Sequence, residues 1–336
     1  MAGAIIVTGV APLSLGEGIV HEIGVWKSDP LIVLDKIPNP SLKRLLKDRG
    51  LFIKEDLNPF EIHGNQEVLF EDRIARKLEN GLKKLGADFI STLINNAGIY
   101  DFGTVDELPY ERIQKLFGVN ALGHIGMLRA VMRVNRKYGV ANKRRLRLCE
   151  VGSFQGLMPR GGRSIYCLTK GGMIDFCQAL ANGELEHVVY IAPPSIDTPM
   201  LHFNHWVTKA QGDKTFWENI YMKDIALYRS IFLNCNHTLT YSHFARFPKN
   251  EQRKLNRAFR DYERIRNQYL NAKEGVATVT EVSETVIHYT FNPLQRPVIV
   301  LGQVSNDCDE RHYGVTEKDL EYDGDHPFSK RALMLS

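Results

Sequence analysis

The 336-residue chain lacks the features that mark several large classes of protein. Its five cysteines form no Cys-x-x-Cys pair, so we expect reduced thiols of a cytoplasmic protein and no disulfide framework. No apolar run approaches the length of a membrane span. The first residues carry no basic segment of the kind that precedes a secretory signal. We therefore expect a cytoplasmic location and no membrane association.

Charge of one sign is also scarce, because the formal net charge is only +4. The densest basic run, residues 143–147, is interpreted as a solvated loop before a strand, and no nucleic-acid partner is expected. His202 and His205 form a His-x-x-His pair, but no third ligand with a suitable spacing accompanies them. The sequence therefore predicts no metal site.

The first 200 residues alternate short apolar runs with helical patterns. Such alternation is typical of a parallel sheet whose two faces are covered by helices. Strands are predicted at residues 4–8, 31–34, 51–54, 89–94, 147–151, 188–192 and 297–301. The fold class is therefore α/β, a Rossmann-type doubly wound parallel sheet. We expect a single domain over residues 1–305, with a helical insert before the last strand.

Glycines follow the first predicted strand, at Gly9 and in the segment Gly16-Glu17-Gly18. Glycine at a strand-to-helix turn lets the backbone approach a pyrophosphate, although any tight turn also favours glycine. Asp35 ends the second predicted strand. A carboxylate there can accept hydrogen bonds from both adenosine ribose hydroxyls and repel the extra phosphate of NADP. The alternative is a surface aspartate at a turn.

Two tyrosines precede a lysine by four positions, as Tyr166–Lys170 and Tyr269–Lys273. Only the first pair has a serine 13 residues upstream, Ser153, directly after a predicted strand. Positions i and i+4 share one face of a helix, so Tyr166 and Lys170 are expected to point together. A lysine ammonium and a positively charged nicotinamide ring would lower the tyrosine pKa from about 10. Ser153 can then hold a substrate oxygen near Tyr166.

With these motifs, the chain resembles the short-chain dehydrogenases/reductases over about residues 4–200. Residues 95–98, Asn-Asn-Ala-Gly, match the family motif that follows the fourth strand. The resemblance implies an oxidoreductase that transfers a hydride between NAD(H) and a secondary alcohol or ketone. It implies that Tyr166 is the general acid/base, that Lys170 also binds the nicotinamide ribose, and that Asn120 positions a water linked to Lys170.

The resemblance also implies which residues bind NAD. They are Gly9, Ser14, Leu15, Gly18, Asp35, Asp56, Leu57, Asn96, Ala97, Gly98, Tyr166, Lys170, Pro193, Ile196 and Thr198. Two departures from the family pattern stand out. Three extra residues lengthen the first glycine turn, which is similar to that of bacterial enoyl-carrier-protein reductases. Pro194 replaces a glycine, which fixes φ and stiffens the loop before Thr198.

Residues 200–275 are rich in aromatic and charged side chains and read as a helical insert, with one amphipathic helix over 250–270. We expect this insert to act as a substrate lid. Its aromatics either line a substrate pocket or pack the insert onto the body; they include Trp206, Phe216, Trp217 and Tyr221. A second helix is predicted at 280–291, and residues 306–336 read as a C-terminal tail. A homodimer or homotetramer is expected through the helices that carry Asn120 and Tyr166.

Two other functions are alternatives to this one. A catalytically silent NAD-binding regulatory protein can have the same fold, and its expected feature is a damaged tyrosine, lysine or serine. All three residues are intact in this chain. A sugar-nucleotide epimerase or dehydratase would show Gly-x-x-Gly-x-x-Gly in the first turn, which is absent.

Overall fold

The chain divides into two compact units, residues 1–195 with 277–336, and residues 196–276. A computed structural model describes the chain at residues 2–47, 49–60, 69–101, 103–106, 108–157, 159, 162–193, 195–196, 198, 200, 276–277, 279–292 and 298–300. Nearly all the predicted site residues belong to the first unit. Ile196 and Thr198 belong to the second.

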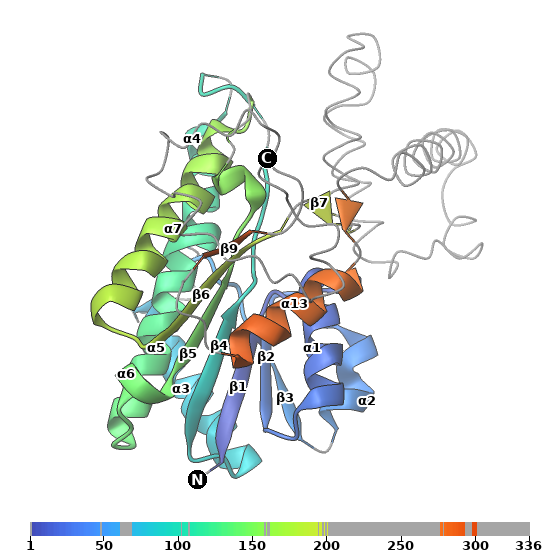
Figure 1. The fold of residues 1–336 in the computed structure, drawn as a ribbon, viewed down its shortest axis with the longest axis vertical. Helices are drawn as coiled ribbons and strands as arrows, with labels where there is room; N and C mark the ends of the chain where they lie inside the picture. Colours follow the sequence, from blue (N-terminus) through green and yellow to red (C-terminus); the bar gives the residue numbers. More distant parts are fainter. Residues whose placement is uncertain are drawn as a thin grey trace, which may run out of the picture. The chain divides into compact units, whose positions relative to one another are not determined.

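The first unit is built on a seven-stranded parallel sheet in the order β3-β2-β1-β4-β5-β6-β9 (Figure 1). Its strands are β1 (Gly3–Thr8), β2 (Leu31–Asp35), β3 (Gly50–Lys54), β4 (Phe89–Asn95), β5 (Arg147–Val151), β6 (His187–Ala192) and β9 (Val298–Val300). The chain first runs outward from β1 to β3, then returns to β4 and builds the other half. This order confirms the predicted Rossmann-type sheet. Ligands of such sheets bind at the carboxyl ends of the strands, where the order reverses.

Helices cover both faces of the sheet (Figure 1). One face carries α3 (Phe70–Leu85), α5 (Gly123–Lys137) and α7 (Ser164–Gly183), whereas α1 (Leu15–Trp26) packs with α13 (Val279–Phe291) on the other. The helix predicted at 280–291 is thus confirmed as α13. Shorter helices connect these elements: η1 (Pro40–Leu42), α2 (Lys43–Leu46), α4 (Tyr110–Phe117), η2 (Gly118–Leu122), α6 (Asn142–Arg145) and η3 (Phe154–Gly156).

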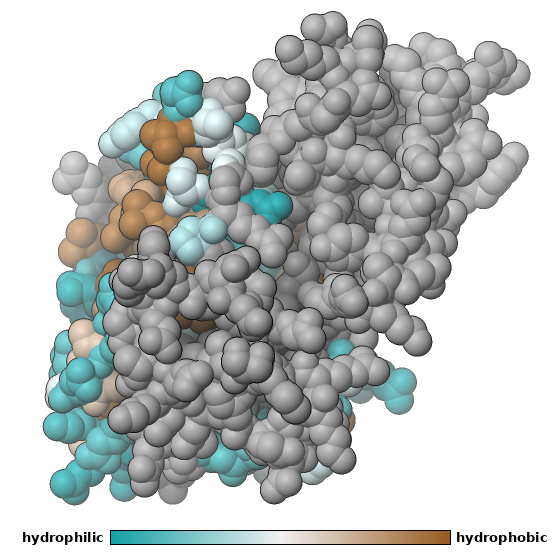
Figure 2. Space-filling model, turned by 45° about the horizontal axis from the view of Figure 1, so that its top comes forward, coloured by the Kyte–Doolittle hydropathy of each residue, from teal (hydrophilic) through white to brown (hydrophobic). Residues whose placement is uncertain are grey.

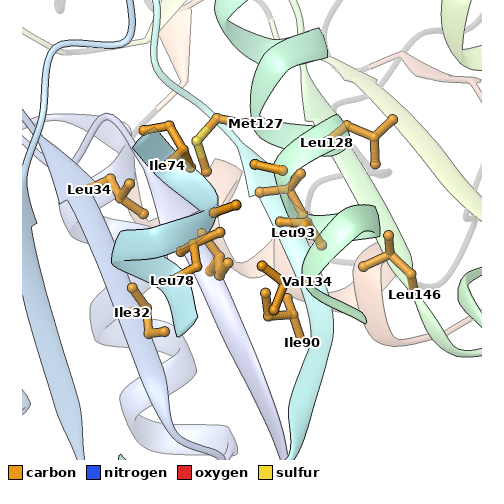
Figure 3. Close-up of a cluster of buried hydrophobic side chains, with 14 of the residues drawn as sticks. Ile32, Leu34, Ile74, Leu78, Ile90, Leu93, Met127, Leu128, Val134 and Leu146 are labelled. Carbon is orange, nitrogen blue, oxygen red and sulfur yellow. The ribbon is translucent and has the colours of Figure 1, made fainter. Parts of the chain in front are cut away.

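The largest cluster of buried apolar side chains lies between the sheet and the pair α3 and α5 (Figure 3). Ile32 and Leu34 of β2 face Ile74 and Leu78 of α3 in this cluster. Every residue of β1 and β2 is buried, which explains why these strands read as continuous apolar runs. Packing in this core holds the strands in register, and so it positions the polar groups that follow the strand ends.

Several predictions fall outside the described residues. They concern the helix at 250–270, the pair His202 and His205, the insert aromatics, the pair Tyr269–Lys273, and the tail at 306–336. At the unit boundary, β7 (Ser195–Ile196) and β8 (Val276–Ala277) form a two-stranded sheet. Among the described helices, none is long and apolar enough to cross a membrane.

Candidate active site

Ser153 directly follows β5 and begins the short helix η3. Its hydroxyl accepts a hydrogen bond from the Gln155 backbone N–H at 3.1 Å, which caps that helix. The flanking N–H groups of Gly152 and Phe154 donate to Ile191 and Pro193 carbonyls at 2.8 and 2.9 Å. The serine is therefore held in a loop whose backbone is bonded to the end of β6.

Tyr166 and Lys170 lie one turn apart on α7, and both side chains are buried. The Lys170 ammonium donates to the Val151 carbonyl at 3.2 Å, beside the serine loop. Tyr166 shares a hydrogen bond with the Ser153 side chain. Its ring also contacts the Tyr100 ring, with centroids 4.9 Å apart. The structure thus brings together the serine, tyrosine and lysine that the spacing predicted.

Burial determines the acid–base properties of this pair. Desolvation raises the pKa of Tyr166 to about 12, and the hydrogen bond from Ser153 is the main influence in the opposite direction. Desolvation lowers the pKa of Lys170, and the Glu150 carboxylate opposes that fall. Without a cofactor the pKa of Tyr166 is thus raised, and its lowering by Lys170 together with a nicotinamide ring stays a prediction. Helical spacing predicts that two side chains meet, but it does not reveal how completely they are desolvated.

Asn120 lies in η2, a π-helical turn between α4 and α5. Its amide bonds both backbone groups of Ile99, donating to the carbonyl and accepting from the N–H, each at 2.9 Å. It also donates to the Thr169 hydroxyl at 3.2 Å. A Cβ added to Gly98 would lie 3.6 Å from Lys170 Nζ and 3.7 Å from Asn120 Oδ1. The glycine therefore keeps the space beside these two polar groups open.

Asn96 and Ala97 connect the ends of β4 and β1. The side chain of Asn96 donates to the Thr8 and Gly9 carbonyls at 3.1 and 2.8 Å. The backbone N–H groups of Asn96 and Ala97 both donate to the Thr8 hydroxyl, at 3.0 and 3.1 Å. Gly9 adopts a φ of +72°, and a Cβ there would meet the Ala97 backbone. Asn96 thus connects the end of β4 to the end of β1, and Thr8, which the sequence did not single out, takes part in the same contacts.

The glycine turn after β1 leads into the N-terminus of α1. Ser14 caps the helix by accepting from the Glu17 N–H at 3.2 Å, and Leu15 is the first helical residue. The Glu17 carboxylate accepts from the Leu13 N–H and the Ser41 hydroxyl, although the sequence reasoning gave this residue no role. Close packing explains the glycine at position 18, because a Cβ there would overlap side chains of α13. A helix N-terminus favours an anion, as a dinucleotide pyrophosphate requires, but Glu17 already places a negative charge there.

Asp35 ends β2 as predicted, and its carboxylate accepts from the Ile37 N–H at 2.8 Å. Burial raises its pKa. The neighbouring Lys36 ammonium lies 3.5 Å from the Asp56 carboxylate. Leu57, the residue after Asp56, is buried. This edge therefore presents an acidic group at the expected ribose position, and its nearest lysine is paired.

Pro193, Ile196 and Thr198 follow β6. Pro193 belongs to the first unit and accepts from the Phe154 N–H. Ile196 and Thr198 belong to the second unit, within which the Thr198 hydroxyl donates to the Ile196 carbonyl at 3.3 Å. Among the described residues, no group of three His, Cys, Asp or Glu side chains could hold a metal ion.

Two further buried residues of the site, His124 and Tyr190, were not predicted. His124 of α5 donates from Nε2 to the Ala97 carbonyl at 2.6 Å, and its Nδ1 pairs with the buried Glu150 carboxylate. Tyr190 of β6 contacts the backbone of both Ser153 and Lys170. These residues come from strands and helices far apart in sequence, so no spacing could reveal them.

Comparison with known proteins agrees with this geometry. The family model described as short chain dehydrogenase matches residues 70–206. The chain is 31% identical over 128 residues to 3-oxoacyl-acyl-carrier-protein reductase FabG of Escherichia coli, which is 37% of this chain and 50% of that protein. It is 30% identical over 134 residues to an NADP-dependent 3-hydroxy acid dehydrogenase of Schizosaccharomyces pombe, 39% of this chain and 49% of that protein. The chain thus spans about half the length of these curated relatives.

Solved structures agree on the fold. Aldohexose dehydrogenase of Thermoplasma acidophilum superposes with a TM-score of 0.53 at 16% identity, covering 86% of this chain and 87% of that one. Over residues 70–206 the chain is therefore similar to the short-chain dehydrogenases, and its fold is that of a solved dehydrogenase.

Proposed function

We propose that the chain is an oxidoreductase that transfers a hydride between NAD(H) and a secondary alcohol or ketone. The observation that carries this proposal is the convergence of Ser153, Tyr166, Lys170 and Asn120. Tyr166 is hydrogen-bonded to Ser153, and the polar groups of Lys170 and Asn120 both lie beside Gly98. All four lie at the carboxyl edge of a doubly wound sheet, where such sheets bind ligands.

The cofactor, when bound, supplies the hydride acceptor or donor. Ser153 holds the substrate oxygen, and Tyr166 gives that oxygen a proton in reduction or removes it in oxidation. A pKa of about 12 keeps Tyr166 protonated at neutral pH, which suits proton donation to a carbonyl oxygen. In alcohol oxidation the phenol must first lose its proton, and positive charge near the phenol would assist that loss.

The proposed preference for NAD rests on Asp35 and Lys36. A buried carboxylate at the end of β2 disfavours a second phosphate on the adenosine ribose, and pairing with Asp56 engages the one adjacent lysine. Asp35→Ala should therefore lower the ratio of the NADPH dissociation constant to the NADH dissociation constant. Tighter binding of NADPH than of NADH by the unaltered chain would contradict the preference.

The main test measures the absorbance of NADH and NADPH with a panel of ketones, and of NAD with the matching secondary alcohols. We expect turnover by the unaltered chain. Tyr166→Phe should lower it by at least about 10²-fold while NADH affinity stays nearly unchanged, because only proton transfer is lost. A variant that keeps more than about a tenth of the rate would contradict the role of Tyr166. Tight NADH binding without turnover on any compound would instead favour the silent NAD-binding protein.

We also propose a homodimer or homotetramer. Leu122 and Leu168 are exposed near Asn120 and Tyr166, and Figure 2 shows apolar residues gathered on one part of the described surface. Exposed apolar patches commonly mark contact with another chain. Light scattering at micromolar concentration is expected to give a multiple of the 38.3 kDa chain mass, and a monomer would refute this expectation. The lid role of residues 200–275 stays a prediction.

A further inference from the structure

Tyr190 is a fully buried tyrosine of β6, between β5 and β9 in the sheet, and its hydroxyl has two partners. The hydroxyl accepts from the Ser153 backbone N–H at 3.1 Å and donates to the Lys170 backbone carbonyl at 3.0 Å. One oxygen atom therefore bridges the residue that would hold the substrate and the helical turn that carries the lysine. Neither of these contacts involves the side chains that would perform the chemistry.

The space for this bridge is provided by Gly152. A Cβ added to Gly152 would overlap the end of the Tyr190 ring, so the ring fills the volume that any other residue at position 152 would need. The remainder of the ring packs with Met173, Ile174 and Cys177 on the buried side of α7. The position of the hydroxyl is thus set by packing on both sides, and not by its hydrogen bonds alone.

The protonation of Tyr190 suits this bridge. Desolvation and the nearby Glu150 carboxylate raise the pKa of the phenol well above its ordinary value, so it stays neutral and keeps its proton for the Lys170 carbonyl. The Ser153 N–H lies next to N–H groups that bond to Ile191 and Pro193. The three consecutive N–H groups of this loop therefore all have acceptors on β6 or at its end.

We propose that Tyr190 is a positioning residue, which sets the distance between the Ser153 loop and helix α7 and thereby aligns the Ser153 hydroxyl with Tyr166. This inference rests on the proposed function. Removing the hydroxyl leaves the Ser153 N–H without its acceptor, removes the additional donor of the Lys170 carbonyl, and frees the loop to shift. A displacement of about 1 Å in a reacting group can cost about 10²-fold in rate. The effect should therefore appear in catalysis and not in cofactor affinity.

The test is Tyr190→Phe in the full chain, which removes one oxygen and keeps the ring that fills the space at Gly152. Tyr138→Phe, at the partly exposed end of α5, is the control. For the ketone reduced fastest by the unaltered chain, kcat should fall by roughly tenfold while the NADH dissociation constant changes by less than about twofold. Because the Ser153 hydrogen bond lowers the Tyr166 pKa, alcohol oxidation by the variant should also rise at a higher pH than in the control.

Amide exchange gives a readout that does not depend on activity. The Ser153 N–H should exchange faster in Tyr190→Phe than in the unaltered chain, and Tyr138→Phe should leave it unchanged. Unchanged Ser153 exchange, or faster exchange with unchanged kcat and pH profile, would overturn the role of Tyr190. Absence of any turnover by the unaltered chain would overturn the proposed function together with this role. If the unaltered chain turns over its substrate but Tyr190→Phe shows no effect, the role of Tyr190 fails and the proposed function stands.

Discussion

Replacing His124 with alanine should destabilise the protein strongly, because it leaves a buried carboxylate without its partner. His124 and Glu150 are both completely buried. The Ala97 carbonyl can only accept, so His124 Nε2 carries a hydrogen, and the facing Nδ1 and Glu150 Oε1 share one proton. The pair is then neutral as a whole. Glu150 Oε2 has no hydrogen-bond partner in the described structure, so no second hydrogen bond replaces the one lost with the imidazole.

Breaking a buried ion pair by removing one partner costs about 3–5 kcal/mol, a large share of the roughly 5–15 kcal/mol that stabilises a typical protein. Urea unfolding of His124→Ala, followed by circular dichroism, should show a midpoint about 1 M or more below that of the unaltered chain, for a slope near 3 kcal/mol/M. The matched double variant, His124→Ala with Glu150→Gln, carries no charge at either of these two positions. Its uncompensated polar groups cost only about 1–3 kcal/mol each.

The double variant should therefore be more stable than His124→Ala alone, although it differs from the natural chain at one more position. This gain in stability distinguishes the two explanations, because loss of packing alone would make the double variant as stable as His124→Ala or less stable. A double variant that unfolds at a lower urea concentration than His124→Ala would refute the argument that an unpaired Glu150 charge dominates the cost.

Three further predictions concern neighbouring groups. Glu150→Gln should lower the pKa of Lys170 further, because it removes the negative charge that raises this pKa. The alkaline limb of the pH profile of kcat/KM should therefore move to lower pH, and an unchanged limb would contradict this. Gly152→Ala should lower the urea concentration at which the chain unfolds, because the added Cβ overlaps the Tyr190 ring. In a Tyr190→Ala background the same substitution should reduce the free energy of unfolding much less, and equal reductions in both backgrounds would contradict the overlap. Glu17→Gln should tighten NADH binding in a fluorescence titration at low salt, since it removes a negative charge from the N-terminus of α1, and weaker binding would show that the carboxylate chiefly holds the turn.

The sheet could be predicted from the sequence because its strands are buried on both faces and read as uninterrupted apolar runs. The boundaries of strands such as β5 and β6 lie within one residue of the predicted ones. The grouping of Ser153, Tyr166 and Lys170 could also be predicted, since helical spacing and a strand end restrict where these side chains lie. Both features depend on local geometry, which a single sequence contains.

The supporting contacts could not be predicted in the same way. Tyr190 reads as one more apolar residue of a buried strand, and its role depends on the missing Cβ at Gly152, directly after the neighbouring strand β5. His124 and Glu150 lie 26 positions apart and meet only when α5 packs on β5. The raised pKa of Tyr166 likewise depends on burial by segments distant in sequence. Long-range packing thus determines the electrostatics of a site whose members are set by short-range spacing.

The end of β5 explains why these contacts act together. Residues 150–153 are consecutive, and each one meets a different part of the site. The first pairs with His124, the carbonyl of the second accepts from Lys170, the third leaves space for the Tyr190 ring, and the N–H of the fourth bonds to the Tyr190 hydroxyl. A shift of one residue in the register of β5 would point every side chain to the opposite face. The position of the proposed substrate-holding serine therefore depends on the packing of the whole strand, and substitutions at residues 150–152 should affect catalysis without touching the substrate.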